Sequence, residues 1–125
     1  MNNIYISGRI TGTTDYMERF SKAEKDLRNR GYIVFNPAKV NAQLPYTAMS
    51  HDDYMKVSFL LLNMCEAIFM MSSWKFSKGA KMEFWRAYQL GMEIIFEDDE
   101  KIEEAVQSIM DDPYIIRETC RIVGA

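Results

Sequence analysis

The sequence contains few of the residues that build metal sites, disulfide frameworks and hydrolytic triads. It has two cysteines, Cys65 and Cys120, and one histidine, His51. The cysteines stand far apart and no CxxC or Cys/His spacing occurs, which excludes a zinc site and a disulfide framework and leaves free thiols in a reducing cytosol as the expectation. His51 adjoins Asp52 and Asp53, which the acidic first turn of a helix explains better than a metal site does. No Ser/His/Asp arrangement can be read, and we expect no metal and no cofactor.

Long apolar runs and blocks of one charge are also missing. No stretch approaches the roughly 20 apolar residues of a membrane span, and the first residues lack the pattern of a secretory signal. The net charge is −3, with lysine and arginine scattered among the acidic residues. This distribution argues against duplex nucleic acid as a partner, although one loop can still be positive enough for a small anion. The absences predict a cytoplasmic protein that binds no membrane and no duplex nucleic acid.

What remains is the composition of an ordinary globular protein. Of the 125 residues, 48% are hydrophobic and 26% are charged, which argues against disorder or a fibrous repeat. A chain of this length has the size of one domain, so we expect residues 1–125 to form a single domain.

Short apolar runs alternate with helical patterns along the chain. Strands are predicted at residues 4–6, 32–35, 67–71 and 93–96. Helices are predicted at residues 15–30, 52–63, 77–90 and 101–110, and from Pro113 onward. Strands that alternate with helices form a mainly parallel sheet covered on both faces. Ligands bind such sheets at the carboxyl ends of the strands, where the loops at residues 7–14, from 36 onward and at 72–78 should meet.

Three connecting segments lead to predictions of their own. Asp15-x-x-Glu18 resembles a capping box with aspartate as the N-cap of the first helix. The acidic run at residues 97–100 is expected to cap the helix at 101–110. The stretch at residues 38–50 is too long for a tight connection, so we expect a loop that covers or lines something.

The segment at residues 72–79 ends the third strand and opens a helix. Backbone N–H groups, Ser77 and Lys78 converge there on a helix N-terminus, as they do in phosphate sites. Serine is also a preferred N-cap, and this interpretation of Ser77 is equally good. The glycine-broken turn at residues 7–12 poses the same choice between holding an anion and turning a corner. Its glycine spacing fits neither a Walker loop nor the dinucleotide fingerprint.

Glu83 is the most informative polar residue of the predicted helix at 77–90. The inward stripe of that helix consists of Ala80, Phe84, Ala87, Tyr88 and Gly91. Glu83 falls on the flank of this stripe, where its carboxylate can approach the end of the first strand and accept a hydrogen bond from Tyr5. Such a carboxylate is a candidate nucleophile or base. The alternative is a glutamate at the edge of a helix face that reaches water.

The opposite face of the same helix carries large apolar side chains. Met82 and Trp85 lie there together with Gln89. Two large apolar side chains should not face water, so we predict that this face contacts a second subunit, with the C-terminal helix as the less favoured partner.

Three motifs in order resemble the nucleoside 2-deoxyribosyltransferase superfamily, and especially its short phage and bacterial members and the nucleoside 5′-monophosphate N-glycosidases. The motifs are Tyr5-Ile6-Ser7-Gly8-Arg9-Ile10-Thr11-Gly12 after the first strand, Phe35-Asn36-Pro37 after the second, and Ser77-x-Gly79-x-x-x-Glu83 at the helix after the third. The resemblance covers roughly residues 4–96.

The resemblance implies a flavodoxin-like (Rossmann-like) three-layer α/β fold with a mainly parallel sheet of four to five strands. It also implies a homo-oligomer whose subunits complete each other's sites. Glu83 is similar to the family's nucleophile and Tyr5 to its hydrogen-bonding partner. The residues implied in substrate binding are Ser7, Gly8, Arg9, Gly12, Asn36, Ser77, Lys78 and Gly79. Members that act on monophosphates have serine where this chain has Ser77, which points to a 5′-phosphate on the substrate.

One position departs from the family pattern. Ser58 stands where the family usually carries an aspartate that assists the reaction, and a serine hydroxyl is a poor acid for a departing base. Asp52 or Asp53 could substitute, or the pocket only binds. We therefore expect an enzyme that cleaves the N-glycosidic bond of a (deoxy)nucleoside 5′-monophosphate, by hydrolysis or base transfer. The alternative is a catalytically silent nucleotide-binding protein of the same fold.

Overall fold

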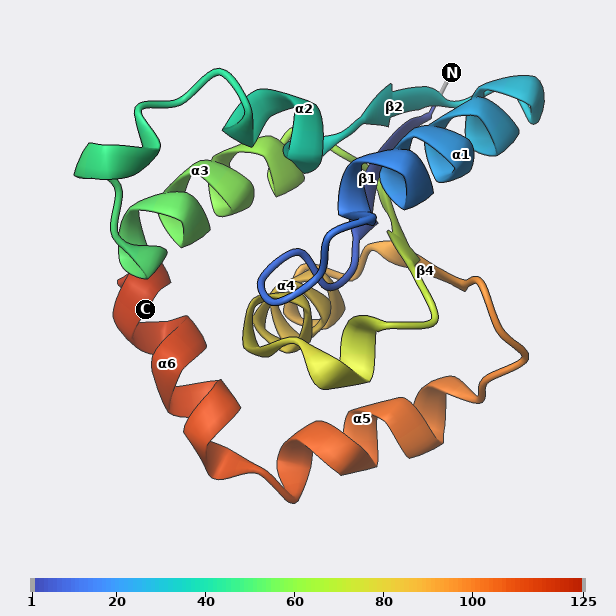
Figure 1. The fold of residues 1–125 in the computed structure, drawn as a ribbon. Helices are drawn as coiled ribbons and strands as arrows, with labels where there is room; N and C mark the ends of the chain where they lie inside the picture. Colours follow the sequence, from blue (N-terminus) through green and yellow to red (C-terminus); the bar gives the residue numbers. More distant parts are fainter. Residues whose placement is uncertain (1, 125) are drawn as a thin grey trace.

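Strands and helices alternate along the chain in the computed structural model, which describes residues 2–124 (Figure 1). The strands are β1 (Asn3–Ser7), β2 (Ile33–Phe35), β3 (Ala67–Met70) and β4 (Glu93–Phe96). The α-helices are α1 (Tyr16–Asn29), α2 (Pro37–Asn41), α3 (His51–Leu62), α4 (Lys78–Gln89), α5 (Ile102–Met110) and α6 (Pro113–Val123). Two short 3-10 turns, η1 (Tyr46–Ala48) and η2 (Trp74–Phe76), interrupt the longer connections. The predicted order of strands and helices is confirmed, except that α2 falls where a loop was expected.

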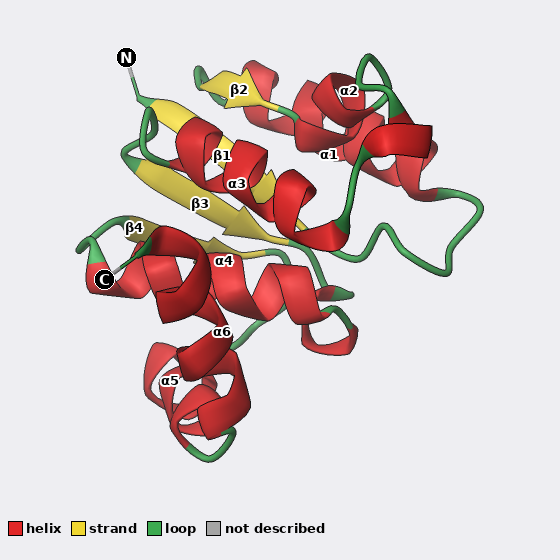
Figure 2. Cartoon of the chain, turned by 90° about the vertical axis from the view of Figure 1, so that its left-hand side faces the viewer, coloured by secondary structure: helices red, strands yellow, loops and turns green. Residues whose placement is uncertain are grey.

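The sheet has four strands in the order β2-β1-β3-β4, and every neighbouring pair is parallel. Helices flank it on both sides, which confirms the predicted α/β flavodoxin-like three-layer fold (Figure 2). The chain leaves β1 toward β2 at one edge and then crosses back to β3 on the other side of β1. The carboxyl ends of β1 and β3 therefore form the topological switch point, where such folds bind ligands.

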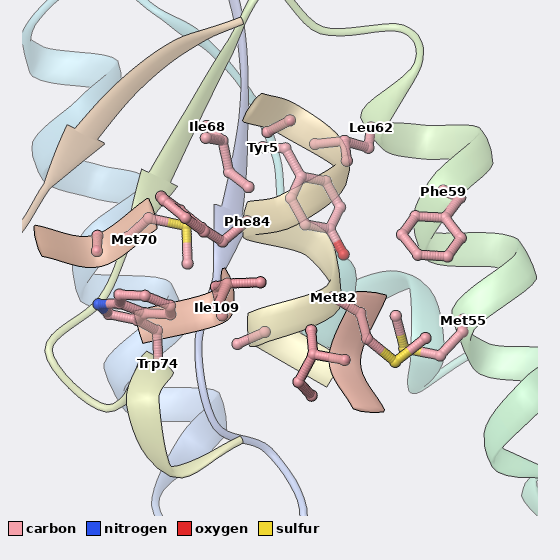
Figure 3. Packing of buried hydrophobic residues seen from close by; sticks show 14 of the residues in the cluster. Tyr5, Met55, Phe59, Leu62, Ile68, Met70, Trp74, Met82, Phe84 and Ile109 are labelled. Carbon is pink, nitrogen blue, oxygen red and sulfur yellow. The ribbon is translucent and has the colours of Figure 1, made fainter. Parts of the chain in front are cut away.

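Side chains of the central strands alternate between two apolar layers. Tyr5 and Ile68 belong to a cluster that α3, α4, α5 and α6 complete, and Figure 3 shows both inside it. Ile4 and Phe69 belong to the opposite cluster, which α1 covers with Phe20 and its neighbours. Both faces of the strands are apolar because a parallel sheet is buried on both sides.

The predicted capping box of α1 is absent. Asp15 occupies the N-cap position, but its side chain accepts no backbone hydrogen bond. Its carboxylate instead pairs with Arg19 one turn along the helix, at 3.2 Å. The capping box occurs at α3, where Ser50 and Asp53 exchange hydrogen bonds with each other's backbone N–H groups.

The acidic run at residues 97–100 does not cap α5, contrary to the prediction. Glu97 accepts a hydrogen bond from the backbone N–H of Ser72 at 2.8 Å. Glu100 accepts one from Trp74 Nε1 at 3.4 Å and pairs with Lys75 at 3.3 Å. The strands β3 and β4 end side by side, so these carboxylates lie close to the N–H donors that follow β3. They bond to those donors and not to the N-terminus of α5. They pin the connection that leads into α4.

The predicted subunit contact through Met82 is wrong. Met82 is buried at 1% exposure in the core cluster of its own chain, and Trp85 packs against the same cluster. The C-terminal helix α6 folds back against α4, which was the less favoured prediction, while Gln89 stays exposed. The predicted inward stripe of α4 is buried from Ala80 to Ala87. At its end, Tyr88 is exposed and packs against the ring of Trp85.

None of the helices in the described residues 2–124 is suited to crossing a membrane. The longest, α1, has 14 residues. Within residues 2–124, none combines the length and the apolar character that a bilayer span requires.

Candidate functional site

A cavity of about 690 Å³ opens at the carboxyl end of β1. Its walls come from the turn after β1, the segment from α2 to η1, one face of α3 and the first turns of α4. The cavity thus lies at the switch point of the sheet, where the strand order predicts a ligand. The segment at residues 38–50 lines it, as expected, although part of that segment is helical.

Glu83 forms part of the cavity wall and is almost completely buried, with 6% of the residue exposed. Tyr5 Oη donates a hydrogen bond to Glu83 Oε2 at 2.5 Å, and Ser7 Oγ donates one to Oε1 at 2.7 Å. Tyr5 and Ser7 are two residues apart on β1, so their side chains leave the same face of the strand and converge on α4. The predicted pairing of Tyr5 with Glu83 is present, and the alternative of a solvated glutamate is wrong.

Burial dominates the acid–base behaviour of this pair. It raises the pKa of Glu83 to about 7, against the opposing effect of hydroxyl groups on Tyr5, Ser7 and Ser58. Burial and the neighbouring Glu83 carboxylate raise the pKa of Tyr5 well above its ordinary value, so its hydroxyl remains a donor. A carboxyl group that titrates near neutral pH inside a cavity is typical of a functional site.

Ser58 lies on the cavity wall beside this pair, buried on α3. The two aspartates that could substitute for the missing family carboxylate do not line the cavity. Asp52 accepts two hydrogen bonds from Arg121 at 2.7 and 2.9 Å, and Asp53 belongs to the capping box with Ser50. Their charges are already engaged at the N-terminus of α3.

Ser77 is the N-cap of α4, and it also lines the cavity. Its Oγ accepts a hydrogen bond from the backbone N–H of Ala80 at 3.1 Å, which is the capping role. Gly79 lines the cavity as well, and a Cβ atom there would come within 3.2 Å of Met55 Sδ. Glycine at this position therefore lets α3 approach the start of α4 closely.

Lys78 lines the cavity but points its charge toward α6. Its Nζ lies 3.1 Å from Glu118 Oε1 and 5.0 Å from the centre of the Tyr114 ring. Contacts with Tyr114 and Glu118 raise the pKa of Lys78. The predicted phosphate-binding cation already has a carboxylate partner.

The glycine-broken turn after β1 has a structural reason at each glycine. A Cβ atom on Gly8 would lie 2.9 Å from Met71 Sδ, so the turn must pass close to the end of β3. Gly12 adopts a φ of +80°, which favours glycine, and does not line the cavity. Arg9 does line it, and its Nε donates to the carbonyl of Thr11 at 3.1 Å. This turn contributes Gly8, Arg9, Ile10 and Thr11 to the cavity wall, whereas its second glycine allows the chain to turn.

Asn36 does not line the cavity, contrary to the prediction. Its side chain accepts a hydrogen bond from the backbone N–H of Ala38 at 3.0 Å and thereby caps α2. It also donates to Glu24 at 3.0 Å, which Lys39 approaches from α2. The asparagine joins α2 to α1 instead of facing a ligand.

Several aromatic side chains of the cavity wall were not predicted from the sequence. Tyr16, Tyr46, Tyr54 and Phe76 all line it, and Tyr46 and Phe76 are 78% and 76% exposed. Of these residues, only Tyr54 could have been predicted from the sequence, because it lies one helical turn before Ser58 on the same face of α3. Within residues 2–124, no group of three or more His, Cys, Asp or Glu side chains could hold a metal ion.

Comparison with known proteins identifies a family but no activity. No curated protein and no solved structure matches the chain. Residues 2–96 match the family described as a domain of unknown function, DUF4406. The match runs from β1 to β4, includes the cavity wall, and leaves α5 and α6 outside it. Since the match spans most of the chain, this protein belongs to the DUF4406 family.

Proposed function

We propose that this protein cleaves the N-glycosidic bond of a (deoxy)nucleoside 5′-monophosphate, with Glu83 as the nucleophile. One observation carries the proposal. A buried carboxylate, held by hydrogen bonds from Tyr5 and Ser7, forms part of a cavity wall at the switch point of the sheet. The choice of the N-glycosidic bond comes from the resemblance of the surrounding motifs to nucleoside 2-deoxyribosyltransferases.

The proposed reaction follows the two steps of a retaining glycosidase. An oxygen of Glu83 attacks the anomeric carbon of the sugar, and the bond from that carbon to the base nitrogen breaks. The electron pair of that bond leaves with the base, which takes up a proton. Water or a second base then attacks the anomeric carbon and gives up a proton, the bond from that carbon to Glu83 breaks, and the carboxylate is restored. Tyr5 and Ser7 orient the carboxylate and favour its charged form.

The cavity suits a nucleotide in size and in the kinds of groups that it offers. Its volume of about 690 Å³ lies within the usual range for small-molecule sites. Arg9 and the N-terminus of α4 supply positive potential for a phosphate. Tyr16, Tyr46 and Tyr54 supply aromatic rings on which a base can stack.

A second candidate function is a nucleotide-binding protein that does not turn its ligand over. The observation in its favour is that Glu83 is the only carboxylic acid among the described residues of the cavity wall. With Ser58 in place of the family's aspartate, no other carboxyl group is at hand to protonate the departing base.

We also propose a cellular location and an oligomeric assembly for the protein. We place the protein in the cytoplasm, where its two free thiols stay reduced, with a nucleotide or nucleoside as its partner. The resemblance also favours a homo-oligomer, formed through a surface other than the buried Met82. Light scattering of the purified protein measures that assembly directly.

Proton NMR of the protein with each common ribo- and deoxyribonucleoside 5′-monophosphate tests the reaction. The intact protein should release free base, and Glu83→Gln should lower the rate by about 1000-fold or more because the nucleophile is lost. Glu103→Gln, an exposed acidic residue on α5, serves as the matched control and should keep full activity.

The outcomes separate the two candidates. Full activity of Glu83→Gln contradicts the proposed mechanism. Binding of a nucleotide without any release of base, with intact Glu83, moves the assignment to the nucleotide-binding protein. Addition of a second free base distinguishes the two enzymatic forms, because a transferase makes a new nucleotide and a hydrolase does not.

A further inference from the structure

Among the described residues, the cavity wall carries one arginine and one lysine, Arg9 and Lys78. Lys78 is the first residue of α4 and directly follows the N-cap Ser77. An anion at this helix N-terminus would lie within reach of the lysine ammonium. That ammonium lies 3.1 Å from the carboxylate of Glu118 on α6.

Glu118 is held in place. Arg121, one turn further along α6, donates to both of its carboxylate oxygens at 3.1 and 3.0 Å. Arg121 in turn makes the two hydrogen bonds to Asp52 at the N-terminus of α3. The carboxylate is therefore part of a network that spans three helices, and such networks hold their geometry better than isolated surface pairs.

We propose that Glu118 determines how strongly the cavity binds the phosphate end of its ligand, because it holds Lys78 in an ion pair that a phosphate must share or break. A phosphate seated at the start of α4 can bind Lys78 only by sharing or breaking its ion pair with Glu118, and the loss of that pair weakens binding. Glu118 acts through Lys78, so it is a determinant of specificity and not a catalytic group. The inference rests on the proposed function only for the identity of the ligand.

Glu118 lies outside the part of the chain that matches the family. The family match ends at residue 96, before α5 and α6 begin. The cavity wall lies within the matched part, whereas the carboxylate that neutralises Lys78 comes from the part beyond it. The C-terminal helix thus adjusts a site that the rest of the chain builds.

Ligand affinity of charge-neutral variants tests this role. The probes are a nucleoside 5′-monophosphate, the matching nucleoside and ribose 5-phosphate, titrated by calorimetry. Glu118→Gln should tighten binding of both phosphate-bearing probes by about five- to tenfold and leave the nucleoside unchanged. Lys78→Met should weaken the phosphate-bearing probes by about tenfold. Glu103→Gln changes the net charge equally and should change none of the affinities.

The double variant Lys78→Met with Glu118→Gln decides whether Glu118 acts through the lysine. In that background the gain from Glu118→Gln should disappear. A gain that persists, equal effects on the nucleoside and its monophosphate, or no binding of phosphate-bearing probes by either wild type or Glu118→Gln overturns the inference. Phosphate-selective tightening without any release of base supports it while contradicting the proposed reaction, so the two failures are distinguishable.

Discussion

At the scale of single residues, the acidity of Glu83 is the property on which the site depends. The side chain is buried, and burial raises its pKa to about 7 although three hydroxyl groups favour the charged form. Near neutral pH the carboxyl is thus divided between a protonated form and a charged form, and only the charged form is a nucleophile. Burial sets this balance, and the hydroxyls of Tyr5, Ser7 and Ser58 oppose it by favouring the charged form.

This pKa predicts a pH-dependent stability. The folded-state pKa of Glu83 is raised from 4.5 to about 7, so the unfolded chain loses the proton first as the pH rises. The contribution of the carboxyl is fully present below its unfolded pKa and is lost as the pH passes through about 7. Glu83→Gln cannot titrate, so its free energy of unfolding relative to wild type should rise by about 3 kcal/mol across this window.

Urea denaturation of both proteins at a series of pH values measures that difference. Carboxylates elsewhere whose pKa values are lowered, such as Glu24, affect both proteins equally and cancel. A difference that stays constant from acid to neutral pH would show that Glu83 titrates normally in the folded protein.

At the scale of the elements, the N-terminus of α4 contributes both to the stability of the helix and to the cavity wall. Glu97 and Glu100 pin the connection before it, and Ser77 caps it. The same turn contributes Ser77 and Gly79 to the cavity wall. A residue there can thus serve the helix and the ligand together, which is why the sequence alone left the role of Ser77 open.

Removal of the cap should affect both properties. Ser77→Ala should lower the free energy of unfolding by about 1 kcal/mol, because the backbone N–H of Ala80 loses its acceptor. It should also weaken binding of a 5′-monophosphate. Ser50→Ala at the capping box of α3 is the matched control, with a similar loss of stability in a denaturation curve and unchanged affinity. Unchanged stability of Ser77→Ala would count against the capping role.

At the scale of the whole molecule, α5 and α6 belong to the core although they lie outside the family match. Ile109 of α5 and Ile115 of α6 are buried at 1% and 2% exposure and pack in one cluster with Phe84 of α4. Figures 1 and 2 show the two helices beside α4, on the side of the molecule away from α1. The C-terminal part therefore holds in place the helix that carries Glu83.

This packing predicts that the chain unfolds as one unit. Ile109→Ala should lower the free energy of unfolding by about 3 kcal/mol, because it leaves a cavity between α5 and α4. Met110→Ala, the next residue and 55% exposed, should change it by less than about 0.5 kcal/mol. Circular dichroism and tryptophan fluorescence should report the same single transition. Two separate transitions would show that α5 and α6 fold independently of the rest.

The periodicity of the sequence determined much of the fold. The β-branched and aromatic runs at each strand alternate with helical stripes, and that order alone predicts a parallel sheet with its ligand at the carboxyl edge. The predicted meeting of Tyr5 and Glu83 also follows from this order, because it places the start of α4 at the carboxyl edge beside β1, while the strand's alternation fixes which face Tyr5 presents.

The tertiary structure decided which partner each polar or amphipathic group takes. Asn36, Lys78 and the acidic run at residues 97–100 all carry groups that suit a ligand or a helix end, and each found a partner elsewhere in the chain. Met82 is buried in the core cluster of its own chain instead of facing a second subunit. Sequence periodicity reports local geometry, but hydrogen bonds and ion pairs act over a few ångströms between segments distant along the chain. Only the packing of the helices brings Glu118 to Lys78 and sets the charge at the cavity.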